Sequence, residues 1–176
     1  MTELNQPTSV QAVQRVLEAA HFAAEKHARQ KRKGAAGEPY INHLIEVAEL
    51  VAASISEPDI NLVIAALLHD TIEDTATTKE ELTRRFGSDV ADLVAEVTDD
   101  KTLPKQERKR LQIETASKKS PRAQTLKVAD KISNLRAILS SPPVDWDQAR
   151  RQEYFAWAQR VVGGFSSPNP ALKSGV

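Results

Sequence analysis

The sequence predicts an all-α protein, a compact globular helical bundle in a single domain. Apolar residues recur at spacings of three and four along almost the whole chain, and no segment alternates or repeats convincingly. At 176 residues, 40% of them hydrophobic, the chain can bury one core. We expect one domain over 1–176, with its core at about 9–163. A flexible N-terminal arm and a tail at 164–176, rich in Pro, Ser and Gly, would flank it.

Three helices are expected in the N-terminal half. The first spans 9 to about 30, and the segment "KRKGAAGEP" ends it. The second follows Pro39 and extends to about residue 53. The third begins at "SEPD", where Ser56 can cap and Pro58 suits a first turn, and it continues into the acidic stretch "HDTIEDT".

Five further helices are expected downstream, one of them in the charged segment after Pro104. In "TTKEELTRRFG", a threonine with a glutamate three residues on and a closing glycine predicts a short capped helix. Apolar periodicity predicts another helix at 90–97, a long one after Pro121 to about residue 138, and a last one at about 146–162. Pro104 opens a charged segment whose lysines and arginines could form a solvated face or line a phosphate site; taken alone, the solvated face is favoured.

Composition excludes several classes of function. Lysines and arginines (24) balance aspartates and glutamates (24), so no overall field would hold the protein to nucleic acid or a membrane. The absence of cysteine excludes disulfides, thiolate ligands and cysteine nucleophiles. The N-terminus lacks the pattern of a signal peptide, and no apolar run approaches about 18 residues. We therefore expect a cytoplasmic protein.

Four residues of types that often bind metals lie within apolar helical patterns: His43, His69, Asp70 and Asp130. Singly, a helix histidine is more often hydrogen-bonded or exposed than a ligand, and an aspartate is usually solvated. Together they point to a cation, because buried aspartates are rarely tolerated unless they are paired or metal-bound. A sulfur-free set favours manganese, iron, zinc or a magnesium-like ion, with room for a water as nucleophile.

Other polar residues lie near these four in the helical pattern. Glu73 and Asp74 follow the His-Asp pair by three to five residues and could handle a proton or be plain solvated residues. Asn134, four residues after Asp130, could bond a sugar or phosphate or have no role. Arg32 and Lys33, in a glycine-bearing loop, could bind phosphate, although alone they are read as solvated.

The segments "YINHLIEVAELV", "ALLHDTIEDT" and "LKVADKISNLRAI" resemble the motifs of the HD-domain superfamily of metal phosphohydrolases. With "RK" before "GEPYINH", "TDDKTLPKQERKRLQ" and "EYFAWAQRVV", the resemblance narrows to the small alarmone hydrolases, free-standing relatives of the RelA/SpoT hydrolase domain. It spans roughly residues 20 to 163. One departure is Leu44, where many relatives have proline after the first metal histidine.

The resemblance implies a guanosine-3′,5′-bis(diphosphate) 3′-pyrophosphohydrolase of the stringent response, which releases pyrophosphate and GDP or GTP, with Mn²⁺ as the usual ion. The ligands would be the two histidines and two aspartates above, and Glu73 and Asp74 the catalytic acids. The nucleotide site would use the following residues: Arg32, Lys33 and Asn134, with Lys105 and Tyr154 lining the same pocket. The sequence does not fix the purine: stacking by Arg32 would accept either ring, so adenosine alarmones, (p)ppApp, stay open as alternative substrates.

Two alternatives remain open. Another HD phosphohydrolase, such as a nucleotide or NADPH phosphatase, would share the metal ligands but release phosphate rather than pyrophosphate. A non-catalytic nucleotide sensor would retain the fold, but the intact Glu73 and Asp74 argue against it. We expect no synthetase domain, because nothing of domain size follows residue 163, and no Walker loop is present. The oligomeric state is left open.

Overall fold

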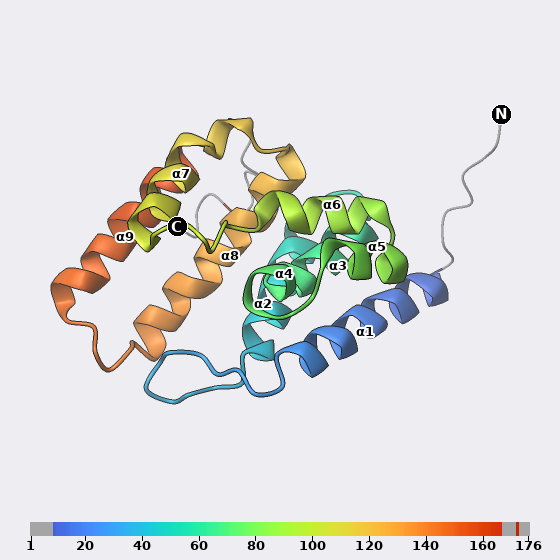
Figure 1. Cartoon of the computed structure of the whole chain (residues 1–176), viewed down its shortest axis with the longest axis horizontal. Helices are drawn as coiled ribbons and strands as arrows, with labels where there is room; N and C mark the ends of the chain where they lie inside the picture. The colour runs from blue at the N-terminus through green and yellow to red at the C-terminus, as the bar shows by residue number, and fades with distance from the viewer. Residues whose placement is uncertain (1–8, 167–171, 173–176) are drawn as a thin grey trace.

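The computed structural model describes residues 9–166 and 172 and forms a bundle of helices (Figure 1). Within these residues there is no β-strand, only two isolated bridges. The all-α prediction is therefore confirmed. The helices are α1 (Ser9–Lys26), α2 (Ile41–Ser54), α3 (Ile60–Leu68), α4 (Thr71–Asp74), α5 (Lys79–Phe86), α6 (Ser88–Val97), α7 (Lys105–Glu114), the 3₁₀ turn η1 (Ala116–Lys118), α8 (Pro121–Ser140) and α9 (Gln148–Gly163).

Helix α3 is the centre of the core. Its residues are apolar on nearly every side, which is typical of a helix surrounded by others, and it contacts α1, α2, α6 and α8. Leu62 and the run from Ile64 to Leu68 are buried. A helix enclosed in this way fixes the position of the polar residues that directly follow it.

Helix α8 joins the two halves of the molecule. In Figure 1 it lies between the group α1 to α6 and the pair α7 and α9, and it packs on α2, α6 and α9. Ser120 caps its first turn by accepting from the Ala123 amide, and Pro121 occupies the start, where no amide partner is needed. Its middle buries charged and polar residues, Asp130, Lys131 and Ser133 among them.

Two details of the third predicted helix are wrong. Asp59, rather than Ser56, caps it, because its side chain accepts from the Leu62 amide at 3.0 Å. The helix also ends at Leu68, and a turn at His69 and Asp70 separates it from the single turn α4. The Thr71 hydroxyl donates to the Leu68 carbonyl at 2.6 Å, so a side chain takes the place of a backbone donor at this helix end.

Most other boundaries agree with the prediction, although α1 ends at Lys26 rather than at about residue 30. Thr78 caps α5 as expected, and Gly87 ends it with a φ of 92°. Asp147 caps α9, one residue after the expected start. The predicted arm at 1–8 and most of the predicted tail lie outside the described residues, although Phe165 and Leu172 are buried against the core. Of the described helices, none has the length and apolarity needed to cross a membrane.

Candidate metal centre and nucleotide cleft

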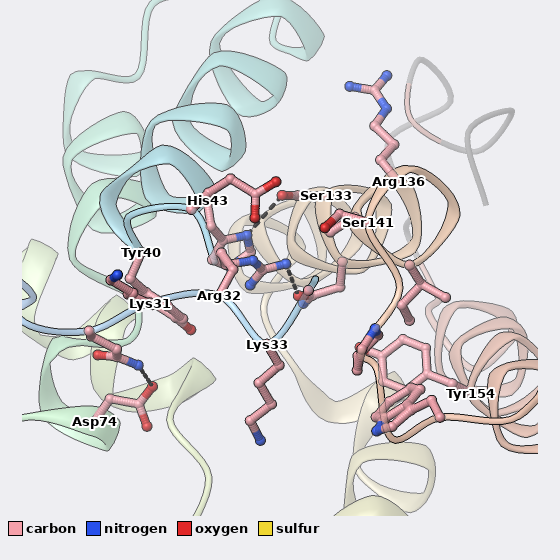
Figure 2. A pocket seen from close by; sticks show the side chains of 18 of the residues that line it. Lys31, Arg32, Lys33, Tyr40, His43, Asp74, Ser133, Arg136, Ser141 and Tyr154 are labelled. Atoms are coloured by element: carbon pink, nitrogen blue, oxygen red, sulfur yellow. Dashed lines mark hydrogen bonds between the residues drawn. The ribbon is translucent and has the colours of Figure 1, made fainter. Parts of the chain in front are cut away.

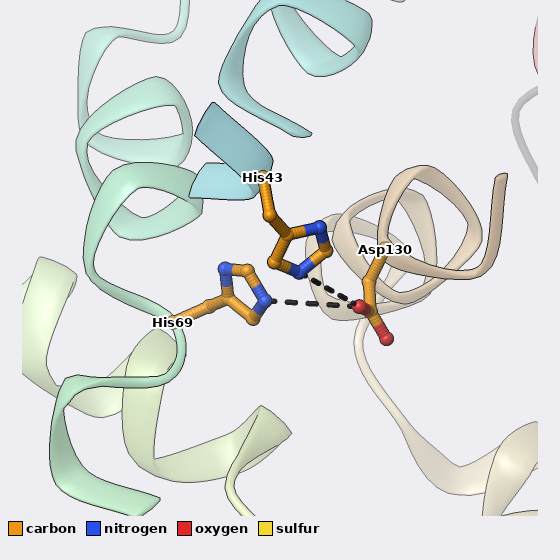
Figure 3. Close-up of side chains that lie close together, drawn as sticks. All are labelled: His43, His69 and Asp130. Carbon is orange, nitrogen blue, oxygen red and sulfur yellow. Dashed lines mark ion pairs between the residues drawn. The ribbon is translucent and has the colours of Figure 1, made fainter. Parts of the chain in front are cut away.

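Three predicted ligands meet where α2, the turn after α3, and α8 converge. One ligand atom from each of His43, His69 and Asp130 lies within 4.8 Å of the others (Figure 3). Asp130 Oδ1 is 3.4 Å from His43 Nε2 and 3.8 Å from His69 Nε2. The residues come from positions far apart in the sequence, so only the packing of α8 against α2 and α3 brings them together.

Both imidazole rings are oriented for a cation by bonds at the opposite nitrogen. His43 Nδ1 lies 2.8 Å from Ser133 Oγ, and His69 Nδ1 lies 2.8 Å from the Ala66 carbonyl oxygen. Each Nε2 is therefore directed into the cluster, and that of His69 is buried without a hydrogen-bond partner. Such an arrangement is typical of histidine ligands, whose second nitrogen is held by the protein. The donors thus fit a divalent cation.

The fourth predicted ligand, Asp70, lies beside the same cluster. Its Oδ2 is 3.2 Å from His69 Nε2 and 3.7 Å from His43 Nε2. The hydroxyl of Tyr40 donates to this oxygen at 2.6 Å, which orients the carboxylate toward the rings. The three donors that lie closest together are those of His43, His69 and Asp130. The structure therefore brings all four predicted ligands to one place, with Asp70 slightly apart from the other three.

Electrostatics in the cluster favour a positive charge. Burial lowers the pKa of His43 below its usual value, so that ring is neutral. Burial also acts to lower the pKa of His69, but the charges of Asp70 and Asp130 outweigh it and raise that pKa to about 10. Without a metal, a proton on His69 therefore offsets the carboxylates, and a bound cation would replace it.

Asp130 is held on both oxygens. The buried Lys131 donates to its Oδ2 at 3.0 Å, and the amide of Asn134 donates to its Oδ1 at 2.6 Å. Asn134 in turn accepts from Arg32 Nη2 at 2.8 Å. Asn134 thus bonds a predicted metal ligand directly, and Arg32 is connected to that ligand through Asn134, which the sequence does not reveal.

The two predicted catalytic acids lie on α4, directly after the turn that carries His69 and Asp70. Glu73 accepts from the Asp99 amide at 3.2 Å, and its Oε1 is 3.5 Å from Arg108 Nη1. Burial is the main cause that raises its pKa above the usual value. Asp74 is held by Gln30, at 3.1 Å, and by Lys101.

A cleft of about 710 Å³ opens over this cluster. The predicted nucleotide residues and acids all contribute to its wall: Arg32, Lys33, Glu73, Asp74, Lys105, Asn134 and Tyr154. Of the predicted metal ligands, His43 lines it. Figure 2 shows Lys33 extending into this space from the loop before α2, with Tyr154 of α9 across from it.

The cleft is rich in positive charge, although the whole chain is neutral. Lys105, Arg108 and Lys109 come from one face of α7, and Lys33 from the opposite loop. Burial lowers the pKa of Lys105, and the charges of Arg150, Lys33 and Arg108 lower it further. Such crowding of like charges favours an anionic ligand that would relieve it.

The segment after Pro104 has two different sides, because one side of α7 faces the cleft rather than open solvent. Residues spaced by three and four, from Lys105 to Gln112, line the cleft. The other side is solvated, where Arg110 pairs with Glu107 and Glu114. The cations of the cleft side recur at a spacing of three and four residues in the sequence. This spacing was the signal that could have separated the cleft side of α7 from its solvated side.

The loop at 31–39 is pinned to the end of α8. A Cβ at Gly34 would overlap the carbonyl and hydroxyl oxygens of Ser141, so only glycine allows this approach. Ser141 Oγ also accepts from the Ala36 amide at 3.1 Å, and Gly34 pairs with Pro143. This contact sets the position of Arg32 and Lys33 relative to the cluster of predicted metal ligands.

Helices surrounding a histidine–aspartate cation site beneath a basic cleft define a class of metal-dependent enzyme that acts on phosphorylated substrates. The family model described as "HD domain" matches residues 19–159. The chain therefore belongs to the HD domain family, as the sequence motifs predicted.

Individual proteins of known name are similar to this chain over nearly its whole length. The chain is 52% identical over 158 residues to the human guanosine-3′,5′-bis(diphosphate) 3′-pyrophosphohydrolase MESH1, covering 90% of this chain and 88% of that protein. It is 46% identical to the Drosophila melanogaster MESH1, with coverage of 89% and 88%. A solved structure described as a metazoan ortholog of SpoT that hydrolyzes ppGpp matches with a TM-score of 0.88 and 43% identity, over 97% of this chain and 93% of that one.

Proposed function

We propose that this chain is an enzyme that hydrolyses the 3′-pyrophosphate of (p)ppGpp, giving pyrophosphate and GDP or GTP. The observation that carries the proposal is the joint geometry of the site. A candidate cation centre, a half-buried acid with a raised pKa and a cluster of lysines and arginines all border one cleft. The names of relatives that match nearly the whole chain support the same activity.

The proposed ligands are His43, His69, Asp70 and Asp130, and the proposed ion is Mn²⁺. Nitrogen and carboxylate donors without sulfur suit Mn²⁺, although the same set suits other divalent ions. A cation held there would lower the pKa of a coordinated water and polarise a phosphoryl oxygen. The neutral His43 ring and the two ionised carboxylates are already in the protonation states that ligation requires.

Glu73 is the proposed proton acceptor. Its carboxylate is mostly buried, and its raised pKa makes it a stronger base than an ordinary glutamate. The Asp99 amide contacts one carboxylate oxygen and Arg108 lies near the other, which restrains the side chain. Asp74 supports Glu73 from the next position, where Gln30 and Lys101 restrain it.

The reaction forms one bond and breaks another. A water oxygen attacks the phosphorus attached to the 3′ oxygen while Glu73 takes the water's proton. The bond between that phosphorus and the 3′ oxygen then breaks, pyrophosphate leaves, and the 3′ oxygen takes up the proton that Glu73 accepted, which restores the carboxylate.

Recognition of two diphosphate groups accounts for the basic lining of the cleft. Lys33, Lys105 and Arg108 approach the cleft from opposite sides, so they can contact phosphates at both ends of a nucleotide. Arg32 lies over the Tyr40 ring at 5.7 Å and bonds Asn134, which places its guanidinium between the cleft and the metal cluster. The aromatic wall formed by Tyr154 and Trp146 provides a surface for a base or ribose.

Hydrolysis of (p)ppApp is part of the same proposal, because stacking does not distinguish the two purines. A cytoplasmic location and the absence of nucleic-acid and membrane partners stay predictions from the sequence.

A panel of 3′-pyrophosphorylated guanosine and adenosine nucleotides, incubated with Mn²⁺ and separated by chromatography, tests the proposal. We expect pyrophosphate and the corresponding nucleoside 5′-diphosphate or 5′-triphosphate in equal amounts, and no turnover by an Asp130→Asn control. Release of orthophosphate from these nucleotides or from NADPH, without pyrophosphate, would instead support a phosphatase. Binding of the nucleotides without turnover in the presence of Mn²⁺ would support a sensor.

A further inference from the structure

Hydrogen bonds connect His43, one of the proposed metal ligands, to three further side chains that lead toward the surface. These three, Ser133, Glu46 and Arg136, are not metal ligands. His43 Nδ1 lies 2.8 Å from Ser133 Oγ, and Ser133 Oγ lies 2.7 Å from Glu46 Oε2. The other oxygen of Glu46 accepts from Arg136 Nη1 at 3.1 Å. Figure 2 shows the first of these bonds between His43 and Ser133.

The positions of these residues connect both ligand-bearing helices. Glu46 follows His43 by three residues on α2, and Ser133 follows Asp130 by three on α8. Residues at that spacing lie on the same face of a helix. His43 and Ser133 are 3% and 1% exposed, so their bond is shielded from competing water.

The direction of the hydrogen bonds follows from the chemistry of each group. An ionised carboxylate can only accept, so the single hydroxyl proton of Ser133 points to Glu46. Ser133 Oγ must then accept from His43, which places the imidazole proton on Nδ1. His43 Nε2 is left with its lone pair directed toward the metal cluster, the form that a metal ligand requires.

Ser133 alone would not determine which nitrogen of His43 carries the proton. A hydroxyl can donate or accept, so without Glu46 it could equally donate to Nδ1 and leave the proton on Nε2. That alternative tautomer cannot bind a cation through Nε2. The carboxylate therefore decides which nitrogen of His43 is available.

We propose that Glu46, acting through Ser133, is a positioning residue that fixes the tautomer and orientation of His43 for cation binding. The proposal rests on the metal site of the proposed function. It concerns binding of the cation itself, and its first readout needs neither metal nor nucleotide.

The test compares Glu46→Ala with Glu49→Ala, which removes an exposed carboxylate from the same helix. In the metal-free parent and the Glu49→Ala control, long-range nitrogen–proton NMR spectra should show His43 protonated at Nδ1. In Glu46→Ala they should show a substantial Nε2-protonated population. Ser133→Ala should show the same change, because alanine fits the space that serine occupies. This second variant keeps the test valid if Glu46→Ala does not fold.

Calorimetric titration of Mn²⁺ into the stripped proteins gives the second readout. Loss of such outer contacts typically weakens metal binding by about 10-fold to 100-fold, and we expect that range for Glu46→Ala and Ser133→Ala. An unchanged His43 tautomer in Glu46→Ala, or Mn²⁺ affinity equal to that of the Glu49→Ala control, would overturn the proposal. Failure of the parent protein to bind Mn²⁺ would overturn it together with the metal site. If both readouts behave as expected but no alarmone is hydrolysed, only the proposed function fails.

Discussion

Replacing Glu73 by glutamine separates the proton-accepting role of this residue from its place in the fold. The amide oxygen of glutamine can still accept from the Asp99 amide, which lies 3.2 Å from Glu73 Oε2. The contact with Arg108, at 3.5 Å, loses its charge, but it is partly exposed and contributes little. The substitution therefore keeps the shape of α4 and removes the base.

Loss of a general base typically lowers the rate by about 100-fold to 10,000-fold. We expect kcat for ppGpp to fall within that range while the Mn²⁺ content is unchanged. Nucleotide affinity should hold or improve, because a negative charge next to the phosphates is gone. Equal losses in kcat and kcat/KM would indicate an interaction made only in the transition state.

The same variant should alter stability in a pH-dependent way. Burial raises the pKa of Glu73 above its ordinary value of 4.5, so the folded protein holds this proton more tightly than the unfolded chain does. The contribution of Glu73 to the free energy of unfolding is fully present below pH 4.5 and is lost as the pH rises through the raised pKa. The metal-free Glu73→Gln variant should therefore melt at a higher temperature than the parent at neutral pH, and the difference should shrink toward pH 4.5.

The assay is pyrophosphate release under saturating nucleotide, with thermal melting across pH and elemental analysis of bound metal. Glu80→Gln, an exposed glutamate on α5, is the matched control and should leave kcat unchanged. Turnover by Glu73→Gln at the parent rate with metal bound would refute the proposed role of Glu73.

Four further results are expected. Asp130→Asn should lose the cation by elemental analysis; Asp130→Ala should in addition lower the melting temperature, because Lys131 would be left buried without its carboxylate. Since the pKa of His69 is raised to about 10, Mn²⁺ binding near neutral pH should release about one proton, and affinity should rise with pH, as calorimetry in buffers of different ionisation enthalpy would show. Gly34→Ala should raise KM and leave metal content intact, because its Cβ forces the Arg32 loop away from Ser141; an unchanged KM would contradict that account. Lys105→Ala should raise KM and weaken its salt dependence, whereas Lys118→Ala, outside the cleft, should not.

Helical periodicity predicted most of the fold because nearly every helix buries an apolar stripe. The break at His69 and Asp70 was not predictable in the same way, because the apolar pattern of α3 continues toward α4 and only the Thr71 and His69 side-chain bonds mark the interruption. The acids are therefore not at the end of the core helix but on a separate turn.

The candidate ligands were predictable because histidine and aspartate are conspicuous in apolar helices. Their outer contacts were not, because Ser133, Glu46 and Tyr40 are ordinary residues in a sequence and become partners only when α2 and α8 pack together. The position of Arg108 in the cleft was hidden for another reason. A basic helix face has the same composition whether it meets water or a phosphate, and only the packing decides between them.

The central claim is that water attacks the phosphorus next to the 3′ oxygen. Hydrolysis of ppGpp with Mn²⁺ in oxygen-18 water, followed by mass spectrometry of the products, tests it directly. The account predicts one heavy oxygen in pyrophosphate and none in GDP. Heavy oxygen in orthophosphate or in the GDP product would contradict it.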